Sequence, residues 1–267
     1  MSTPKVLVLR TAGTNCDKET AYAFELAGAR AEMVHINRFI KKERDLSEYQ
    51  ILAIPGGFTY GDDVASGKIL ANEIKNKLGE DIKNFIDDGK LIIGICNGFQ
   101  VLVKAGFLPD LNGFQTIQAT LTINDSAKFE DRWVYLKLAT CYSLLSTKCV
   151  WAQNIPETIY LPVAHGEGKF VPRDKEVLRR LRENNQIVFQ YVDEKGNLAG
   201  YPYNPNGSVE NIAGICDNTG RIFGLMPHPE RHIFSHQHPR WTRKKCLPEG
   251  DGLAIFRNGV GYIKKNL

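Results

Sequence analysis

Residues 91–98 carry the letters LIIGICNG, an apolar run that leads directly into a cysteine flanked by glycines. The run predicts a buried strand, followed by a helix that ends near Gly106. The spacing of Gly94, Cys96 and Gly98 is that of a nucleophile elbow, in which glycines leave room beside a strained turn. The Cys96 sulfur is then expected to be exposed above the sheet at a helix N-terminus, whose partial positive charge favours the thiolate.

The chain before this stretch alternates short apolar runs with helical patterns, as parallel βαβ units do. Strands are expected at 6–9, 31–36, 51–54 and 91–95, and helices from Asp17 to Gly28 and over 68–88. These units predict an α/β fold with a doubly wound, mostly parallel sheet. Ligands of such sheets bind beyond the carboxyl ends of the strands, where both Cys96 and the turn Pro55-Gly56-Gly57 lie.

The second half of the chain has few helical patterns and several short strand-like runs. Strands are expected at 121–123, 133–138, 148–152, 186–191 and 222–226, a turn at 206–207, and helices at 174–184 and 255–264. Gly259 and Gly261 weaken the last helix. These runs predict an antiparallel section added to the parallel sheet. Because no linker or repeat interrupts the pattern, the whole chain, 1–267, is interpreted as a single domain.

Composition is that of an ordinary globular protein and argues against several kinds of partner. Of the 267 residues 43% are hydrophobic and 24% charged, and the net charge is only +4. A nucleic-acid binder would concentrate basic residues on one face, and a membrane span needs roughly 18 consecutive apolar residues. The six cysteines form no CxxC pair, and the sequence starts without the apolar region of a secretory signal. A cytoplasmic protein with reduced thiols is therefore expected.

A base for the thiol is found in the letters PHPE, residues 227–230, which follow the predicted strand 222–226. Residues i and i+2 of an extended segment project from one face, so His228 and Glu230 can lie side by side. A thiol nucleophile for acyl transfer needs such a histidine and a group that orients it. The N–H of Asn97 and an N–H of the glycine turn after residue 54 are placed to form an oxyanion hole.

Each of these features also has a purely structural explanation. Cys96 could be a small buried residue between strand and helix, and PHPE could be a solvated loop. Cys16 is the alternative nucleophile, because it also precedes a predicted helix, but it lacks the flanking glycines. The combination of nucleophile, base and orienting group favours the catalytic interpretation, with Cys96 as the nucleophile.

The segments GICNGFQ (94–100) and PHPER (227–231) together resemble the class I, or triad, glutamine amidotransferases. Two further segments, PGGFTYGD (55–62) and PVAHGEG (162–168), are similar to one branch of that family. This branch comprises the glutaminase subunits of phosphoribosylformylglycinamidine synthase, an enzyme of de novo purine synthesis. The similarity covers most of the chain, and it implies the flavodoxin-like fold of class I amidotransferases.

The resemblance also implies a role for each site residue. Cys96 would attack the side-chain amide of L-glutamine to give a thioester and ammonia. His228 would transfer the protons, and Glu230 would orient the imidazole. The oxyanion donors and the substrate contact would come from Gly57, Asn97 and Gln100.

The same resemblance implies a division of labour between subunits. Ammonia would pass to a synthetase subunit, and a small third subunit usually bridges the two. No loop of the form G-x-x-x-x-G-K-[ST] is present. No cofactor is therefore expected in this chain, and ATP and magnesium are expected in the synthetase. Docking of the synthetase is expected to complete the site through the flexible glycine-rich turn 56–61.

Two segments, 112–128 and 232–250, depart from the family pattern. The second holds three histidines that follow His228, and it also holds Trp241. No metal site is expected there, because prolines interrupt the helix that such histidine spacing needs, and one tryptophan is too little for RNA stacking. Three alternative functions remain: a glutamine amidotransferase of another pathway, a related cysteine hydrolase or peptidase, and a non-catalytic binding module.

Overall fold

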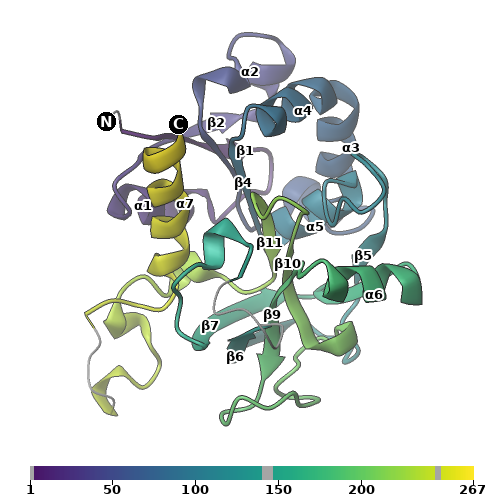
Figure 1. Ribbon diagram of the computed structural model, residues 1–267, viewed down its shortest axis with the longest axis vertical. Coiled ribbons are helices and arrows are strands. Elements are labelled where there is room, and N and C mark those ends of the chain that lie inside the picture. The colour runs from purple at the N-terminus through teal and green to yellow at the C-terminus, as the bar shows by residue number, and fades with distance from the viewer. Residues whose placement is uncertain (1–2, 140–146, 244–247) are drawn as a thin grey trace.

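The computed structural model describes residues 3–139, 147–243 and 248–267 and shows one large mixed sheet flanked by helices (Figure 1). Within these residues nine strands form the sheet in the order β2-β1-β3-β4-β11-β10-β9-β6-β7. The parallel part comprises β1 (Lys5–Arg10), β2 (Arg30–His35), β3 (Ile51–Ile54), β4 (Leu91–Ile95) and β11 (Ile222–Leu225). The antiparallel part comprises β10 (Ile212–Cys216), β9 (Ile187–Val192), β6 (Glu130–Leu138) and β7 (Thr158–His165). The predicted doubly wound sheet with an added antiparallel section is confirmed.

Helices flank the parallel part of the sheet. α1 (Asp17–Leu26) and α7 (Leu253–Asn266) pack together on one side, and α3 (Lys68–Lys77), α4 (Gly79–Asp87) and α5 (Asn97–Ala105) lie on the other (Figure 1). The short α2 (Ile36–Ile40) follows β2, and α6 (Lys175–Glu183) lies beside the antiparallel part. Among the described helices none is long and apolar enough to cross a membrane.

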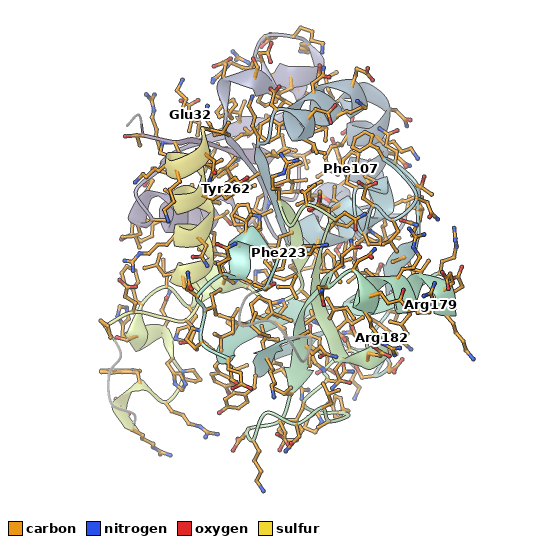
Figure 2. All side chains as sticks on the ribbon, viewed as in Figure 1. Glu32, Phe107, Arg179, Arg182, Phe223 and Tyr262 are labelled. Atoms are coloured by element: carbon orange, nitrogen blue, oxygen red, sulfur yellow. The ribbon has the colours of Figure 1, made fainter. Side chains whose placement is uncertain are left out.

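The strand that leads into Cys96 is buried along its whole length, as a central parallel strand covered on both faces should be. Phe107 and Phe223 are fully buried parts of the same core (Figure 2). Arg179 and Arg182 of α6 instead point outward (Figure 2), and Arg179 pairs with two glutamates of its own helix. The cysteines that the structure describes are free and buried, namely Cys16, Cys96, Cys149 and Cys216, whereas Cys141 and Cys246 lie outside the described residues.

Several predicted elements have different bounds in the structure, and for two of them the local cause is clear. The helix expected over 68–88 is two helices, because Leu78 leaves the helical conformation (φ −127°, ψ 9°) and α4 begins at Gly79. The strand expected at 31–36 ends at His35, whose side chain accepts from the Asn37 N–H in the first turn of α2. Both differences are local backbone effects at the ends of elements.

The strand expected at 148–152 is wrong. Val150–Ala152 form a buried turn of 3₁₀ helix instead of a strand. The Trp151 ring is fully buried, and its Nε1–H donates to the Arg221 carbonyl oxygen at 2.9 Å. An apolar run this short has no periodicity that separates a strand from another buried segment, so only tertiary packing decided its conformation.

Three strands were not predicted from the sequence, namely β7, β8 (Lys169–Pro172) and β10. β8 pairs with β5 (Ala119–Thr122) in a separate two-stranded sheet, and β5 corresponds to the strand expected at 121–123. β7 contains Pro162, which argues against a strand in general. It is tolerated here because β7 lies at the edge of the large sheet and pairs only with β6.

The two glycines that weakened the predicted closing helix have different surroundings in α7. A Cβ on Gly259 would overlap the Trp151 ring, whereas no neighbouring atom lies within 4 Å of a Cβ on Gly261. We expect Gly261→Ala to raise the free energy of unfolding by about 0.5–1 kcal/mol, because alanine favours the helix. Gly259→Ala should lower it by about 1–3 kcal/mol, because the ring must move. Urea unfolding of both variants measures the changes, and a stabilised Gly259→Ala would contradict this packing explanation.

Candidate active site

Cys96 stands between β4 and α5 in a strained backbone conformation. Its φ of 51° and ψ of −106° lie outside the regions that L-residues normally adopt. A Cβ on Gly94 would lie 2.6 Å from the Gly98 carbonyl oxygen, and a Cβ on Gly98 would overlap the Ile54 carbonyl oxygen in β3. Close approach of backbone therefore requires both glycines of the elbow, at the positions that the sequence spacing predicts.

The Cys96 sulfur is more deeply covered than the elbow pattern predicts. The residue is only 5% exposed, and its thiol lies 3.6 Å from the Ala164 carbonyl oxygen of β7. The antiparallel section brings β7 against the nucleophile, which the sequence could not indicate. The expectation of an exposed sulfur is therefore corrected, and the thiol is largely shielded from bulk water.

The segment that carries the predicted base emerges beside the nucleophile because β11 lies next to β4. The two strands run parallel, and the Cys96 N–H donates to the Leu225 carbonyl oxygen at 2.8 Å. Residues that follow β11 thus meet residues that follow β4 at one edge of the sheet. The His228 N–H also donates to the Pro162 carbonyl oxygen of β7 at 2.8 Å, which fixes the histidine between two strands.

His228 and Glu230 lie side by side, as the i, i+2 spacing predicts. Their side chains are at most 2% exposed, and the His228 Nδ1 lies 2.7 Å from Glu230 Oε1. The carboxylate can only accept, so Nδ1 carries the hydrogen. The other ring nitrogen, Nε2, has no hydrogen-bond partner among the described residues. It is therefore free to exchange a proton with the nucleophile or the substrate.

The electrostatic surroundings favour a protonated form of His228. Burial opposes the imidazolium, but the Glu230 carboxylate and the Cys96 sulfur favour it, and the pKa of His228 lies well above its ordinary value. Because the pair is buried, water screens the carboxylate only weakly. The histidine can therefore take the proton of the thiol and hold it as an imidazolium.

Two backbone N–H groups are available at the ends of β3 and β4. Gly57 has a φ of 148°, and a Cβ there would lie 2.8 Å from the Gly13 carbonyl oxygen, so a side chain does not fit. Asn97 is the first residue of α5. Among the described residues neither of their N–H groups donates to another protein group. These are the two donors predicted for the oxyanion hole.

Asn97 and Gln100 connect the first turn of α5 to the loops around it. Asn97 Oδ1 accepts from the Thr59 hydroxyl at 2.7 Å, and its Nδ2 donates to Gln100 Oε1 at 2.9 Å. Gln100 is 3% exposed, and its Nε2 donates to the Glu167 carbonyl oxygen at 2.6 Å. Gln100 therefore ties Asn97 to the loop after β7, and its contact with a substrate stays a prediction.

A partly buried ionic network in the same region was not predicted from the sequence. Lys104 Nζ lies 3.3 Å from Glu167 Oε2 and donates to the Ser66 carbonyl oxygen at 2.6 Å. Asp62 accepts from the Ser66 hydroxyl at 2.9 Å. Burial lowers the pKa of Lys104 and raises that of Asp62. A signal was present, because Asp62 and Glu167 lie in the two segments that resemble the amidotransferase branch.

The glycine-rich turn 56–61 is held more firmly than its composition predicts. The N–H groups of Phe58 and Tyr60 donate to the carbonyl oxygens of residues 12–13 at 2.9 and 2.8 Å. Tyr60 and Asp62 have φ values of 55° and 54°, a conformation that non-glycine residues rarely adopt. Such strain persists only where surrounding contacts impose it. The turn is therefore a strained and pinned element, not the flexible loop that was expected.

His165 ends β7 directly after the residue that faces the Cys96 sulfur. It is buried, and burial lowers its pKa to about 3, so the imidazole is neutral near pH 7. Asn206 Nδ2 lies 3.5 Å from His165 Nε2. His165 lies in the segment 162–168 that resembles the amidotransferase branch, but the sequence predicted no role for it. The structure thus places an uncharged imidazole next to the β7 residue that contacts the Cys96 sulfur.

Cys16, the alternative nucleophile, lies on the Nδ1 side of the His228 ring. Its sulfur is 4.0 Å from that nitrogen. Burial raises the pKa of the Cys16 thiol to about 11, which keeps it neutral and makes it a poor nucleophile near pH 7. The structure thus places both cysteines near the histidine and favours Cys96 for the attack.

Donor atoms of Cys16, His228 and Glu230 lie within 4.8 Å of one another, a spacing that can hold a metal ion. The Nδ1–carboxylate hydrogen bond occupies two of the three donors. The Arg231 guanidinium also donates to the Cys16 sulfur at 3.1 Å, and its positive charge would repel a cation. The donor set therefore fits a hydrogen-bonded triad better than a metal centre.

The histidine-rich segment after the triad contains no continuous helix where it is described. Residues 229–231, 235–237 and 241–243 form separate turns of 3₁₀ helix, and residues 244–247 lie outside the described part. The rings of His232 and His238 pack around Trp133 of β6. The predicted interruption by prolines is confirmed, and two of these histidines belong to an aromatic cluster.

Acyl transfer by a thiol needs a histidine, a group that orients it, and donors for an oxyanion, and this edge of the sheet offers all three. On a doubly wound sheet such a set defines the class of triad-type cysteine amidohydrolases. Comparison with known families is more specific. The family described as "CobB/CobQ-like glutamine amidotransferase domain" matches this chain over residues 3–263, and the chain belongs to that family.

Curated relatives are similar over their whole length. The subunit PurQ of phosphoribosylformylglycinamidine synthase from Dehalococcoides mccartyi is 53% identical, with 99% of this chain and 100% of that protein covered. The subunit of the same name from Methanococcus maripaludis strain S2 is 46% identical, with 98% of each chain covered. A chain solved as part of "PurLQS from Thermotoga maritima" superposes with a TM-score of 0.73 at 29% identity, covering 98% of this chain and 100% of that one.

Proposed function

We propose that this chain is the glutaminase subunit of a phosphoribosylformylglycinamidine synthase. It hydrolyses L-glutamine to glutamate and ammonia. A synthetase partner uses the ammonia, with ATP and magnesium, to convert formylglycinamide ribonucleotide into formylglycinamidine ribonucleotide in de novo purine biosynthesis. The observation that carries this function is the full-length similarity, at 53% identity, to the Dehalococcoides subunit of that enzyme. The triad geometry around Cys96 supports it.

The reaction begins when His228 Nε2 takes the proton of the Cys96 thiol. The sulfur attacks the side-chain amide carbon of glutamine, a C–S bond forms, and the carbonyl electron pair moves onto oxygen. The N–H groups of Gly57 and Asn97 stabilise that oxyanion. The imidazolium then returns its proton to the amide nitrogen, the C–N bond breaks, and ammonia leaves a γ-glutamyl thioester on the sulfur.

Hydrolysis of the thioester uses the same groups. His228 Nε2 removes a proton from water, whose oxygen attacks the thioester carbon. The C–S bond breaks, the sulfur takes the proton back, and glutamate leaves. Glu230 stabilises the imidazolium in both halves of the cycle, because its carboxylate accepts the Nδ1–H at 2.7 Å. Every step is thiol chemistry or proton transfer, so this chain uses no cofactor of its own.

The chain works within a cytoplasmic assembly that contains the synthetase and a small bridging subunit. Similarity to a chain solved within PurLQS supports an assembly of this kind. The decisive test mixes the chain with the synthetase from the same cell and measures glutamine-dependent formation of formylglycinamidine ribonucleotide. Glutamine hydrolysis that never yields this product would assign the chain to another pathway.

We expect the chain alone to hydrolyse glutamine slowly. Near neutral pH most free ammonia is ammonium, which is not a nucleophile, so hydrolysis without an acceptor wastes glutamine. The synthetase with acceptor and nucleotide bound should raise kcat by about ten-fold or more, as in other sites that partner binding completes. Glutamate release by the purified chain, with and without the partner, measures the effect. Equal rates would mean that the site is preformed.

An exposed aromatic pair offers a route for this activation. Phe58 follows Gly57 directly and is 46% exposed, and it stacks on Phe129, which is 51% exposed, with ring centroids 6.2 Å apart. A partner that covers this pair would contact the strained turn that carries one oxyanion donor. Phe58→Ala should therefore reduce the stimulation by the synthetase while leaving the slow hydrolysis by the isolated chain within about two-fold.

A further inference from the structure

A buried thiol and an ion pair lie behind the triad histidine and take no part in the reaction described above. The Cys16 sulfur is 4.0 Å from His228 Nδ1 and accepts from Arg231 Nη2 at 3.1 Å. Arg231 also donates from Nε to Glu19 Oε1 at 3.0 Å. One contiguous set of contacts therefore runs from the imidazole through the sulfur to a guanidinium and its carboxylate.

The Cys16 thiol is a neutral spacer in this set. It donates its own hydrogen to Asn15 Oδ1 at 3.2 Å, which leaves the sulfur lone pairs for the guanidinium. Burial holds the pKa of this thiol near 11, so it carries no charge near pH 7. The backbone fixes its position, because the Cys16 N–H donates to the Gly56 carbonyl oxygen at 3.2 Å. The sulfur thus separates the guanidinium from the imidazole without cancelling its charge.

The direction of the Arg231 side chain is informative. It directly follows Glu230, whose Oε2 has no hydrogen-bond partner among the described residues. An arginine beside a buried carboxylate usually pairs with it. Here the guanidinium instead makes its hydrogen bonds with Glu19 and the sulfur, and it acts on Glu230 only through the electrostatic interaction. The hydrogen bond of Glu230 thus remains with His228.

We propose that Arg231 and Glu19 are positioning residues that set the proton affinity of the Cys96–His228 pair, with the Cys16 thiol as the spacer between them and the imidazole. This inference rests on the proposed glutaminase function and adds a control of the same site. Arg231 opposes protonation of the histidine, and Glu19 offsets part of that effect. Protonation of His228 is thereby favoured by the Glu230 carboxylate and opposed by the Arg231 guanidinium, whose charge Glu19 partly neutralises.

The distances make this effect measurable. The contacts of 3.1 and 4.0 Å that meet at the Cys16 sulfur place Arg231 Nη2 within about 7 Å of His228 Nδ1. A unit charge at that distance shifts a titration by roughly 0.5–1 pH unit where water at a partly exposed guanidinium raises the effective dielectric constant to about 35–70. The other groups that act on the histidine are Glu230, the sulfurs of Cys96 and Cys16, and the neutral His165. None of these groups changes in the variants described next.

The test uses charge removal from each member of the ion pair. Arg231→Gln removes a cation that disfavours the addition of a proton to His228 and to the Cys96 thiolate. The apparent pKa values of the pair should therefore rise by roughly 0.5–1 unit. Glu19→Gln removes an anion and should lower them by a few tenths of a unit, because this carboxylate is more remote and partly exposed. Arg231→Lys keeps the charge and should stay close to the wild type. The double variant should lie between the two single variants, because the two charge removals act in opposite directions.

The readout is the pH dependence of Cys96 alkylation by iodoacetamide in the full chain, followed on the Cys96 peptide by mass spectrometry. It does not require glutamine hydrolysis, so it separates failure of this inference from failure of the proposed function. The pH profile of kcat/KM in the complex with the synthetase provides the second measurement. Lys83→Gln on α4 removes a remote surface charge as a matched control, and thermal melting confirms that each variant is folded. Shifts of the two single variants in the same direction, or no shift in Arg231→Gln, would overturn the proposal.

Discussion

Cys96→Ala is expected to abolish glutamine hydrolysis while leaving the fold intact. The change removes one sulfur atom from a turn whose backbone is held by the close approach of Gly94 and Gly98 to their neighbours. Without the thiol no thioester can form, so no slower version of the same pathway remains. Glutamate release should fall to the level of the assay background, and the melting temperature should stay close to that of the wild type.

Two controls test whether this loss reflects the nucleophile. With ammonium supplied instead of glutamine, the Cys96→Ala complex should still make product, because the synthetase is untouched. Cys16→Ala should keep at least about a tenth of wild-type activity, since its neutral thiol lies beside His228 without taking part in the attack. A loss in Cys16→Ala as deep as that in Cys96→Ala would exchange the roles of the two cysteines.

His228→Asn is expected to lower kcat by roughly 10²–10⁴-fold, because proton transfer to and from the leaving group is lost. Glu230→Gln should cost less, because the glutamine amide can still accept the Nδ1–H while it no longer stabilises the imidazolium. Steady-state kinetics of glutamine hydrolysis by the complex rank the two variants. A larger fall of kcat in Glu230→Gln would show that the carboxylate does more than orient the ring.

Glu230→Gln should also change the pH profile. In the wild type the Glu230 carboxylate raises the pKa of the buried His228, so the neutral base is present only at higher pH. Removing the negative charge lowers that pKa, and the acid limb of kcat/KM should move to lower pH even as the rate falls. A limb that moves to higher pH would contradict the assigned role of the carboxylate.

Most of the parallel sheet could be predicted, because its strands are continuous apolar runs ended by glycines or turns. β4 is the clearest case, since every residue of it is buried and the glycine spacing continues beyond it. The antiparallel part was predicted less completely. Pro162 argued against a strand at β7, and this proline is tolerated only because β7 lies at a sheet edge. The short apolar run around Trp151 could not be distinguished from a strand by its sequence pattern.

The sequence by itself determined which groups can do chemistry. Flanking glycines identified Cys96, and i, i+2 spacing put His228 and Glu230 on one face, because both signals depend only on backbone geometry within a few residues. The Asn97 donor followed from the same reasoning, whereas the choice of Gly57 within the turn after β3 came from the family resemblance. Their catalytic roles stay predictions until the variants above are measured.

Only the tertiary structure decided what surrounds these groups. Strand order brings the ends of β4 and β11 together, so Cys96 and the segment that carries His228 meet although they are far apart in the chain. The same folding covers the Cys96 sulfur with β7, and it places Cys16 and Arg231 behind the imidazole. Local sequence sets dihedral angles and faces, whereas burial and the distance between charges depend on packing between remote segments. Those two quantities set the strength of every electrostatic interaction in the site.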